Sequence, residues 1–196
     1  MTTPHQIWLV RHAETEWSAS GRHTSRTDLP LLPDGEAAAR ALAPILAGHE
    51  FSLVLSSPRL RARRTAELSG YGARIEIAED LCEWDYGQDE GLTTAQIRQS
   101  RPDWDIWQAG PLGGETVEQV GLRCQRVIQR AITASGDTLC FAHGHVLRIF
   151  AATWLQLPPS RGRSFTLRAG TISVLGFERQ SRAIICWDTG GLHLLP

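Results

Sequence analysis

The sequence predicts an α/β fold in which one sheet is covered by helices on both of its faces. Short apolar segments typical of buried strands alternate along the chain with longer segments typical of helices. Strands that read as nearly continuous apolar runs indicate a sheet buried on both sides. The length of 196 residues suits one core, and no internal repeat or low-complexity linker divides the chain. We therefore expect a single domain over residues 1–196.

The N-terminal half is predicted to contain three strands and two helices. The strands are expected at residues 7–10, 51–55 and 75–77. A polar loop over residues 11–33 follows the first strand, and a helix rich in Ala and Leu then runs over residues 34–47. The next helix is expected to begin with Ser57 as its N-cap and Pro58 at its first position.

The C-terminal half is predicted to hold two helices that flank a buried strand, followed by further strands. A loop-rich segment over residues 83–114 comes first. A helix over residues 115–134, a strand over 138–142 and a helix over 144–154 follow it. Alternating segments at residues 164–168, 172–177 and 183–187 are strand-like.

The composition argues against nucleic-acid and membrane partners. The formal net charge is −1, whereas both kinds of partner usually require a net basic face. No segment approaches the ~20 apolar residues that span a bilayer, and residues 1–5 lack the pattern of a signal peptide. We expect a cytoplasmic protein with four reduced cysteines. A homodimer remains compatible with the sequence.

Two histidine motifs follow directly on predicted buried strands. Arg11-His12 comes after the strand at residues 7–10, and His143-Gly144-His145 comes after the strand at residues 138–142. In open α/β sheets, ligands bind beyond the carboxyl ends of the strands. One such histidine alone would more often be structural or exposed, but two at strand ends are candidates to meet in one site.

Four arginines crowd the segment that opens the helix after residue 57. Cations near the start of a helix oppose its dipole, and a bound anion would offset that unfavourable charge. Helical side chains lean back toward the N-terminus, so Arg61 is expected to project toward the same carboxyl edge of the sheet. A solvated basic face is the alternative, and we expect it for most of the four. Because arginine matches phosphate oxygens, the histidines and arginines together indicate a phosphate site.

Glu83 is a candidate proton donor. It lies in a loop beside the large ring of Trp84. A carboxyl group in such a place can act as a general acid. Alone this signal is weak, since most glutamates are solvated.

Over essentially its whole length, the sequence resembles the histidine phosphatase superfamily, also called the phosphoglycerate mutase-like family. The resemblance lies in several ordered motifs, which are far more specific together than any Arg-His pair. They are Leu9-Val10-Arg11-His12-Ala13-Glu14-Thr15-Glu16-Trp17, Gly21-Arg22, Asp28-Leu29-Pro30-Leu31, Ser57-Pro58 with Arg61-Ala62 and Thr65-Ala66, Glu83 with Tyr86-Gly87 and Glu90-Gly91, Gly114-Glu115-Thr116, and Ala142-His143-Gly144-His145.

The resemblance implies a three-layer α/β/α sandwich with a mostly parallel central sheet, and a role for each matching residue. His12 would be the phosphorylated nucleophile, and Glu83 would protonate the leaving oxygen and later activate water. Arg11, Arg61 and His143 would hold the phosphoryl group. Ser18, Thr24 and Gly144 fall where relatives contact phosphate or substrate. We expect the mouth of the site to be lined by His23, Ser25, Arg26, Trp84, Tyr86 and Arg98, which adds Ser25 and Tyr86 to the substrate-binding set.

Departures from the mutase pattern favour hydrolysis. Ala13 and Ser25 stand where glycine is common, Ser18 stands where mutases have Asn, and Glu83 is followed by Trp-Asp-Tyr-Gly. The chain is also shorter than cofactor-dependent mutases. Its runs near Arg61, Glu83 and His143 look most like bacterial broad-range acid phosphatases and the fungal sedoheptulose-bisphosphatase branch.

We therefore expect a phosphomonoesterase of the histidine acid phosphatase type, acting on small phosphorylated metabolites such as sugar phosphates. No H-E-x-x-H or clustered carboxylate motif is visible, so no metal and no other cofactor is expected. Two alternatives remain: a phosphoglycerate mutase, and a non-enzymatic binder of phosphometabolites that retains a decayed site. The joint presence of all five expected catalytic residues argues against decay.

Overall fold

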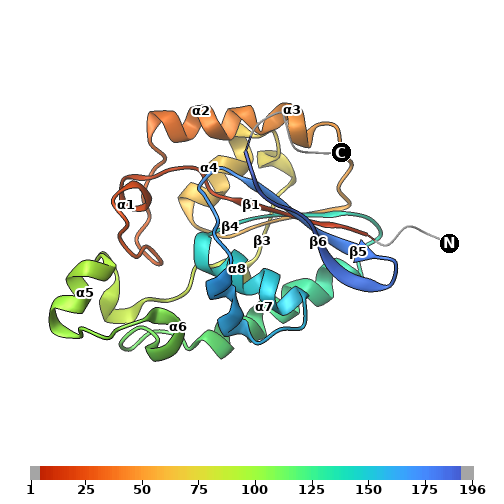
Figure 1. Cartoon of the computed structure of the whole chain (residues 1–196). Coiled ribbons are helices and arrows are strands. Elements are labelled where there is room, and N and C mark those ends of the chain that lie inside the picture. Colours follow the sequence, from red (N-terminus) through yellow and green to blue (C-terminus); the bar gives the residue numbers. More distant parts are fainter. Residues whose placement is uncertain (1–4, 191–196) are drawn as a thin grey trace.

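A sheet of six strands forms the centre of the computed structural model, which describes residues 5–190 (Figure 1). The strand order is β3-β2-β4-β1-β5-β6. The pairs β3–β2, β2–β4 and β4–β1 are parallel, whereas β5 runs antiparallel to both of its neighbours. The predicted mostly parallel sheet is confirmed. The strands are β1 (Ile7–Arg11), β2 (Leu53–Ser56), β3 (Glu76–Ile77), β4 (Thr138–Ala142), β5 (Ile172–Glu178) and β6 (Ser181–Thr189).

Strand β1 shows why the sheet is buried on both faces. Successive side chains of a strand point to opposite faces. Ile7 and Leu9 belong to the core under one face, and Trp8 and Val10 belong to the core under the other. All four are at most 2% exposed, so neither face of this strand meets water.

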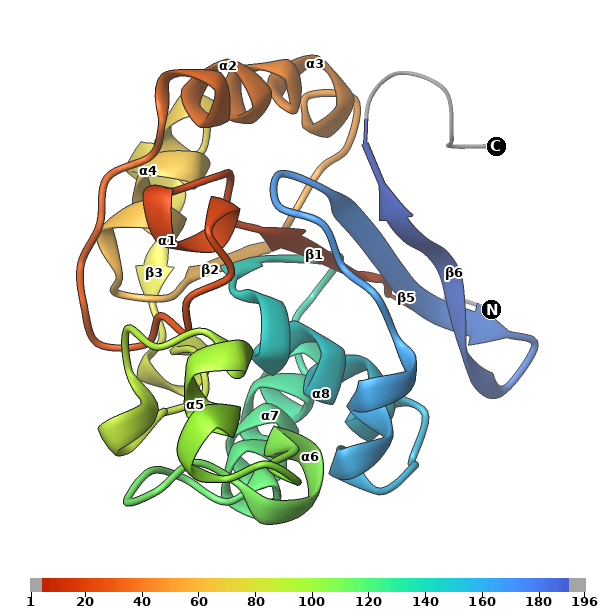
Figure 2. The ribbon, with the colours of Figure 1, turned by 60° about the vertical axis from the view of Figure 1, so that its left-hand side comes forward.

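Helices cover both faces of the sheet, as Figures 1 and 2 show. One layer contains α2 (Pro33–Ala41), α3 (Ala43–Leu46) and α4 (Leu60–Leu68), and the other contains α7 (Val117–Ile132) and α8 (Gly144–Trp154). The three-layer α/β/α sandwich is therefore confirmed. Shorter helices connect these parts: α1 (Glu16–Ala19), α5 (Thr94–Ser100), α6 (Ile106–Ala109), and the 3-10 turns η1 (Gly72–Arg74), η2 (Glu79–Leu81), η3 (Gly87–Asp89) and η4 (Pro159–Ser164).

The single helix predicted over residues 34–47 is two helices. Helix α2 ends at Ala41, and α3 begins at Ala43. Pro44 explains the break, because proline has no N–H to donate to the carbonyl four residues earlier and its ring clashes with that turn.

The predicted start of the helix after Ser57 was wrong. Helix α4 begins at Leu60, and its N-cap is Arg59. The free N–H of Leu60 donates to the Asp28 carboxylate at 2.7 Å, so a residue from a distant loop caps the helix. The Ser57 hydroxyl is instead 2.7 Å from a histidine ring of the site described below.

The remaining differences lie in connecting segments. Residues 164–168 do not form the predicted strand: they leave η4 and cross above β1, where the Leu167 carbonyl accepts a hydrogen bond from Arg11. Helix α1 lies within the predicted loop of residues 11–33 and is fixed by a capping box between Thr15 and Ser18. Helices α5 and α6 lie within the loop-rich segment and stand beside the α7–α8 layer in both views (Figures 1 and 2).

Candidate active site

The register of three neighbouring strands brings their following residues together. Arg11 of β1 pairs with Ala142 of β4, so His12 and His143 leave the sheet side by side. The His12 amide donates to the Ala142 carbonyl at 2.9 Å. On the other side of β4, the Ser57 amide donates to the carbonyl of Phe141 at 2.9 Å. Parallel pairing thus gathers residues from distant parts of the sequence at one edge.

His12 presents one ring nitrogen to the cavity. Its Nδ1 lies 2.7 Å from the Ala13 carbonyl, which can only accept, so Nδ1 carries the hydrogen. Its Nε2 has no partner within residues 5–190, and His12 lines the cavity. Burial, and then the charges of Arg61 and Arg11, hold the pKa of His12 well below its usual value. The ring is therefore neutral near pH 7, with an unshared electron pair on Nε2.

His143 and Arg61 form a fixed pair behind His12. The rings of His143 and His12 meet edge to face, with centroids 5.1 Å apart. Arg61 is fully buried, and its Nε donates to His143 Nδ1 at 3.1 Å. Since that nitrogen accepts, the hydrogen of the neutral His143 ring lies on Nε2 and is donated to the Ser57 hydroxyl at 2.7 Å. Burial and the charge of Arg61 keep the pKa of His143 well below its usual value.

Arg61 also holds residues 24–27, called the entrance loop below, in place. Its guanidinium donates to the carbonyls of Thr24, Ser25 and Thr27 at 3.0–3.2 Å. The Glu90 carboxylate accepts the amides of Ser25 and Thr27 from the other side. The loop is thereby held between a buried cation and an anion.

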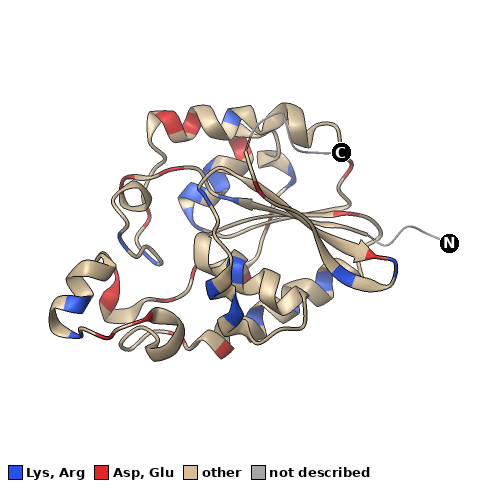
Figure 3. Cartoon of the chain, viewed as in Figure 1, with Lys and Arg blue, Asp and Glu red and all other residues tan. Residues whose placement is uncertain are grey.

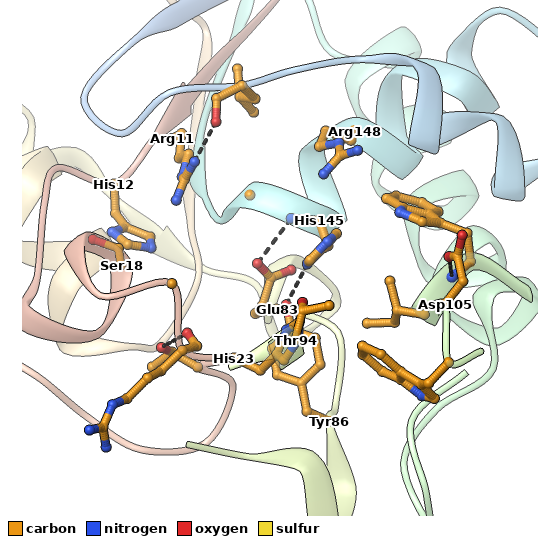
Figure 4. Close-up of a pocket in the computed structure, with 18 of the residues that line it drawn as sticks. Arg11, His12, Ser18, His23, Glu83, Tyr86, Thr94, Asp105, His145 and Arg148 are labelled. Atoms are coloured by element: carbon orange, nitrogen blue, oxygen red, sulfur yellow. Dashed lines mark hydrogen bonds between the residues drawn. The ribbon is translucent and has the colours of Figure 1, made fainter. Parts of the chain in front are cut away.

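Glu83 is fixed against the start of α8 (Figure 4). Its Oε1 accepts the amides of Trp84 and Val146 at 2.9 and 2.8 Å, and its Oε2 accepts the amide of His145 at 3.0 Å. Each carboxylate oxygen has two lone pairs, so Oε2 keeps one that these amides do not use. Glu83 lines the cavity that His12 lines.

Arg11 and Gly144 pack against each other at the top of the cavity. The Arg11 Nη1 donates to the Leu167 carbonyl, and its buried Nε has no partner within residues 5–190. A Cβ atom at Gly144 would lie 3.3 Å from the Arg11 guanidinium carbon. Glycine at this position therefore lets the guanidinium lie directly on the first turn of α8. Burial lowers the pKa of Arg11.

A cavity of about 440 Å³ joins these residues to a second, distal wall. Figure 4 shows Arg11, His12 and Ser18 on one side, Glu83 and His145 in the middle, and Asp105 and Arg148 on the other side. Positively charged segments of α4 and α8 lie on the two sides of this sheet edge (Figure 3). The distal wall comprises Thr94, Arg98, Trp104, Asp105, Ile106, Trp107 and Arg148.

The structure brings most of the predicted site residues together. Of the expected catalytic set, Arg11, His12 and Glu83 line the cavity, while Arg61 and His143 lie directly behind His12. Of the expected substrate-binding set, Ser18, Thr24, Tyr86 and Gly144 line it. Ser25 does not, because it is 3% exposed and enclosed by the contacts of the entrance loop.

Besides Ser25, two residues predicted at the mouth lie elsewhere. Trp84 is fully buried, and its indole N–H donates to the Glu115 carbonyl. Arg26 pairs with Asp85 at 2.6 Å and leaves 73% of its side chain exposed. His23 and Arg98 line the cavity as predicted.

His145, Arg148, Asp105 and Trp107 also line the cavity and were not predicted as site residues. Residues three apart on a helix share a face, so the position of Arg148 relative to His145 was a usable signal. Within residues 5–190 there is no group of three or more His, Cys, Asp or Glu side chains that could hold a metal ion. No helix in this part of the chain has the length and apolar character needed to cross a bilayer.

The fold and this site are those of an α/β protein that acts on phosphoryl groups. Comparison with known proteins identifies its family. The sequence model of the histidine phosphatase superfamily (branch 1) matches residues 7–189, so the chain belongs to this family.

Individual relatives carry phosphatase and mutase names. An acid phosphatase of Mycobacterium tuberculosis is 40% identical over 184 residues, which cover 92% of this chain and 90% of that one. A sedoheptulose 1,7-bisphosphatase of Saccharomyces cerevisiae is 38% identical over 187 residues, covering 79% and 69%. A probable phosphoglycerate mutase of Photorhabdus laumondii is 27% identical, covering 95% and 92%. A solved Mycobacterium tuberculosis structure superposes with a TM-score of 0.90 at 38% identity, over 96% of this chain and 99% of that one.

The free energy of unfolding is expected to fall as the pH drops below about 6.5, the ordinary histidine value. The folded protein holds the pKa of His12 and of His143 well below that value. In the window between folded and unfolded values, the unfolded chain binds protons that the folded protein does not. Stability is therefore complete above the unfolded pKa and is lost as the pH falls.

Each of these histidines contributes at most roughly 1.4 kcal/mol per pH unit. Urea unfolding at about pH 7.5, 6.5 and 5.5 measures the slope. The variant His12→Asn, which lacks one of these groups, should show a smaller slope. A slope that does not change in this variant would contradict the assignment.

Proposed function

We propose that this protein is a phosphomonoesterase that hydrolyses small phosphorylated metabolites, sugar phosphates in particular, through a phosphohistidine on His12 and without a metal ion. The observation that carries the proposal is the orientation of His12. Its Nδ1 is bonded to the Ala13 carbonyl, and its free Nε2 faces the cavity beside Arg11. A nucleophile needs this arrangement, in which the ring is neutral, held in place and open on one side.

In the first half of the reaction, His12 Nε2 attacks phosphorus as the bond to the leaving oxygen breaks. The leaving oxygen takes a proton from Glu83 Oε2. In the second half, Glu83 takes a proton from water, the water oxygen attacks phosphorus, the bond to Nε2 breaks, and inorganic phosphate is released. The charge that develops on the phosphoryl oxygens is stabilised by Arg11, with Arg61 and His143 supporting the site from behind.

The substrate class is supported by the cavity and by the named relatives. The distal wall offers polar groups from Thr94, Asp105 and Arg148, which suit hydroxyl and anionic oxygens. The relative from Saccharomyces cerevisiae is named for a sugar bisphosphate. The relatives named as phosphatases are 40% and 38% identical, compared with 27% for the one named as a mutase, which favours hydrolysis over phosphoryl transfer between substrate positions.

A substrate panel tests the proposal. Release of inorganic phosphate from sugar phosphates is expected to give the highest kcat/KM values, with 3-phosphoglycerate a weaker substrate. Incubating 3-phosphoglycerate with and without its bisphosphate should yield negligible mutase product. Poor values for every sugar phosphate, together with efficient hydrolysis of a nucleotide or a phosphoprotein, would refute the substrate class. No hydrolysis of any ester would favour a binding protein.

Activity is expected to survive excess EDTA. Arginine side chains supply the positive charge that a divalent ion supplies in metal-dependent phosphatases. The measurement compares initial rates before and after prolonged dialysis against EDTA. Complete loss of activity that Mg²⁺ or Zn²⁺ restores would show that the reaction needs a metal.

A further inference from the structure

His145 lies in the centre of the cavity, and the mechanism above does not use its side chain. It is the second residue of α8, and its backbone amide supports Glu83. Its ring packs edge to face against the rings of Trp84 and Trp107, with centroids 5.9 and 5.3 Å away. Substitutions at this position remove the side chain without removing the amide that binds Glu83.

Tyr86 fixes which nitrogen of this ring carries hydrogen. The Tyr86 hydroxyl lies 2.6 Å from His145 Nδ1 and has no other hydrogen-bond partner within residues 5–190. Burial raises the pKa of Tyr86 well above its usual value, so the hydroxyl keeps its hydrogen. Since Nδ1 is the only partner of this hydroxyl within residues 5–190, donation from the hydroxyl to Nδ1 is the arrangement that pairs its hydrogen. Burial and the charge of Arg148 lower the pKa of His145 well below its usual value. The single hydrogen of this neutral ring therefore lies on Nε2.

The Nε2–H of His145 is open to the cavity. His145 lines the cavity, and Nε2 neither bonds to a described residue nor belongs to the fully enclosed unpaired atoms. One turn further along α8, Arg148 lies over the Trp107 ring at 4.7 Å, and no carboxylate within residues 5–190 forms an ion pair with it. The Nε and Nη2 of Arg148 donate to the carbonyls of Gly162 and Arg163 at 3.2 Å, so within residues 5–190 its Nη1 and the Nε2–H of His145 are the side-chain donors that α8 leaves unused at the cavity.

We propose that His145 is a specificity residue whose Nε2–H donates to an oxygen of the leaving group, and that Tyr86 is a positioning residue that holds His145 in this tautomer. The inference rests on the proposed phosphatase function and deepens it. The site favours esters whose leaving group carries hydroxyl or anionic oxygens over simple aryl esters. In Figure 4, His145 lies between the distal wall and Glu83, the proposed proton donor to the ester oxygen.

The kinetic test compares phenyl phosphate, whose leaving group has no further oxygen, with glucose 6-phosphate. His145→Phe keeps an aromatic ring but has no donor, so kcat/KM for glucose 6-phosphate should fall about 10-fold more than kcat/KM for phenyl phosphate. His145→Gln places an N–H near the position of Nε2 and should recover most of that difference. Equal losses on both esters, or no recovery by Gln, would overturn the proposal.

The role of Tyr86 has its own readouts. In ¹⁵N spectra of the parent protein, His145 should show a protonated Nε2 and a bare Nδ1, and Tyr86→Phe should give a mixture of tautomers. Tyr86→Phe should lower kcat/KM for glucose 6-phosphate about 3- to 10-fold. The same change made in the His145→Gln background should cost almost nothing more, since Gln has no tautomer to fix. A parent spectrum with a protonated Nδ1 would refute the positioning role of Tyr86. Equal losses on Tyr86→Phe in the parent and in His145→Gln would refute it as well.

Two further variants separate this proposal from loss of stability. Tyr71→Phe also removes a buried tyrosine hydroxyl, one that donates to the Leu46 carbonyl away from the cavity, and should not change the ratio between the two esters. The double variant Tyr86→Phe with His145→Phe removes both partners, so no buried hydroxyl is left unpaired, and it should still show the selective loss.

Failure of this inference is distinguishable from failure of the proposed function. A parent protein that is inactive on all phosphate esters would refute the proposed function itself. An active parent whose His145→Phe variant loses equally on both esters would refute only this inference.

Discussion

Replacing His12 with alanine is expected to reduce kcat by at least about 10⁴-fold, as loss of a nucleophile does in other covalent mechanisms. Alanine removes the nitrogen that attacks phosphorus in the first half of the proposed reaction. Arg11, which stabilises the phosphoryl oxygens in the proposed mechanism, and Arg61 behind the site remain in place, so substrate should still bind. The measurement is phosphate release, combined with alkaline-quench trapping of a phosphohistidine, which the parent should form and the variant should not.

The fold of this variant should survive, because the backbone bonds of residue 12 to β4 do not involve the side chain. His49→Ala is a matched control: His49 packs against Trp8 on the far side of β1 and does not line the cavity. It should keep the activity of the parent. Substantial turnover by His12→Ala with an unchanged circular dichroism spectrum would refute the phosphohistidine mechanism.

Replacing Glu83 with glutamine is expected to lower the rate of phosphoenzyme formation from sugar phosphates by about 10²- to 10⁴-fold, the range found for general acid catalysis. The loss should be much smaller for p-nitrophenyl phosphate, whose leaving oxygen departs as a stable anion and needs no proton. This dependence on the leaving group distinguishes an acid from a residue that only binds substrate. The measurement is single-turnover phosphoenzyme formation with both esters.

Glutamine also changes the contacts of residue 83, since its amide nitrogen would face the amide of His145. Urea unfolding should therefore accompany the kinetics. Glu90→Gln is a matched control, because Glu90 also accepts backbone amides but does not line the cavity. Its effect on rate should not depend on the leaving group. Equal losses by Glu83→Gln on both esters would show that Glu83 is not the acid.

Local patterns in the sequence were sufficient for the buried strands and for the residues that follow them. Ile7, Leu9 and their neighbours form a continuous apolar run, and the residue after such a run reaches the carboxyl edge of the sheet. That is why His12 and His143 could be predicted as partners from separate parts of the chain. The break in the helix predicted over residues 34–47 was missed, although its cause, Pro44, is a local one that the sequence shows.

Contacts between distant segments decided the rest. The start of α4 depends on Asp28, and the burial of Ser25 depends on Glu90 and Arg61, which no local pattern reveals. The distal wall arises because α5 and α6 fold beside α8.

The sequence by itself therefore determined the family, the sheet and the residues at its carboxyl edge, because these follow from periodicity and from motifs that are short along the chain. Only the tertiary structure decided which nitrogen of each histidine carries hydrogen. That choice depends on one acceptor or donor within about 3 Å of each ring: the Ala13 carbonyl at His12, Arg61 at His143 and Tyr86 at His145. Arg61 and Tyr86 are separated from their histidines by tens of residues, so only the folded chain brings them together, and in this protein such contacts set the chemistry of the site.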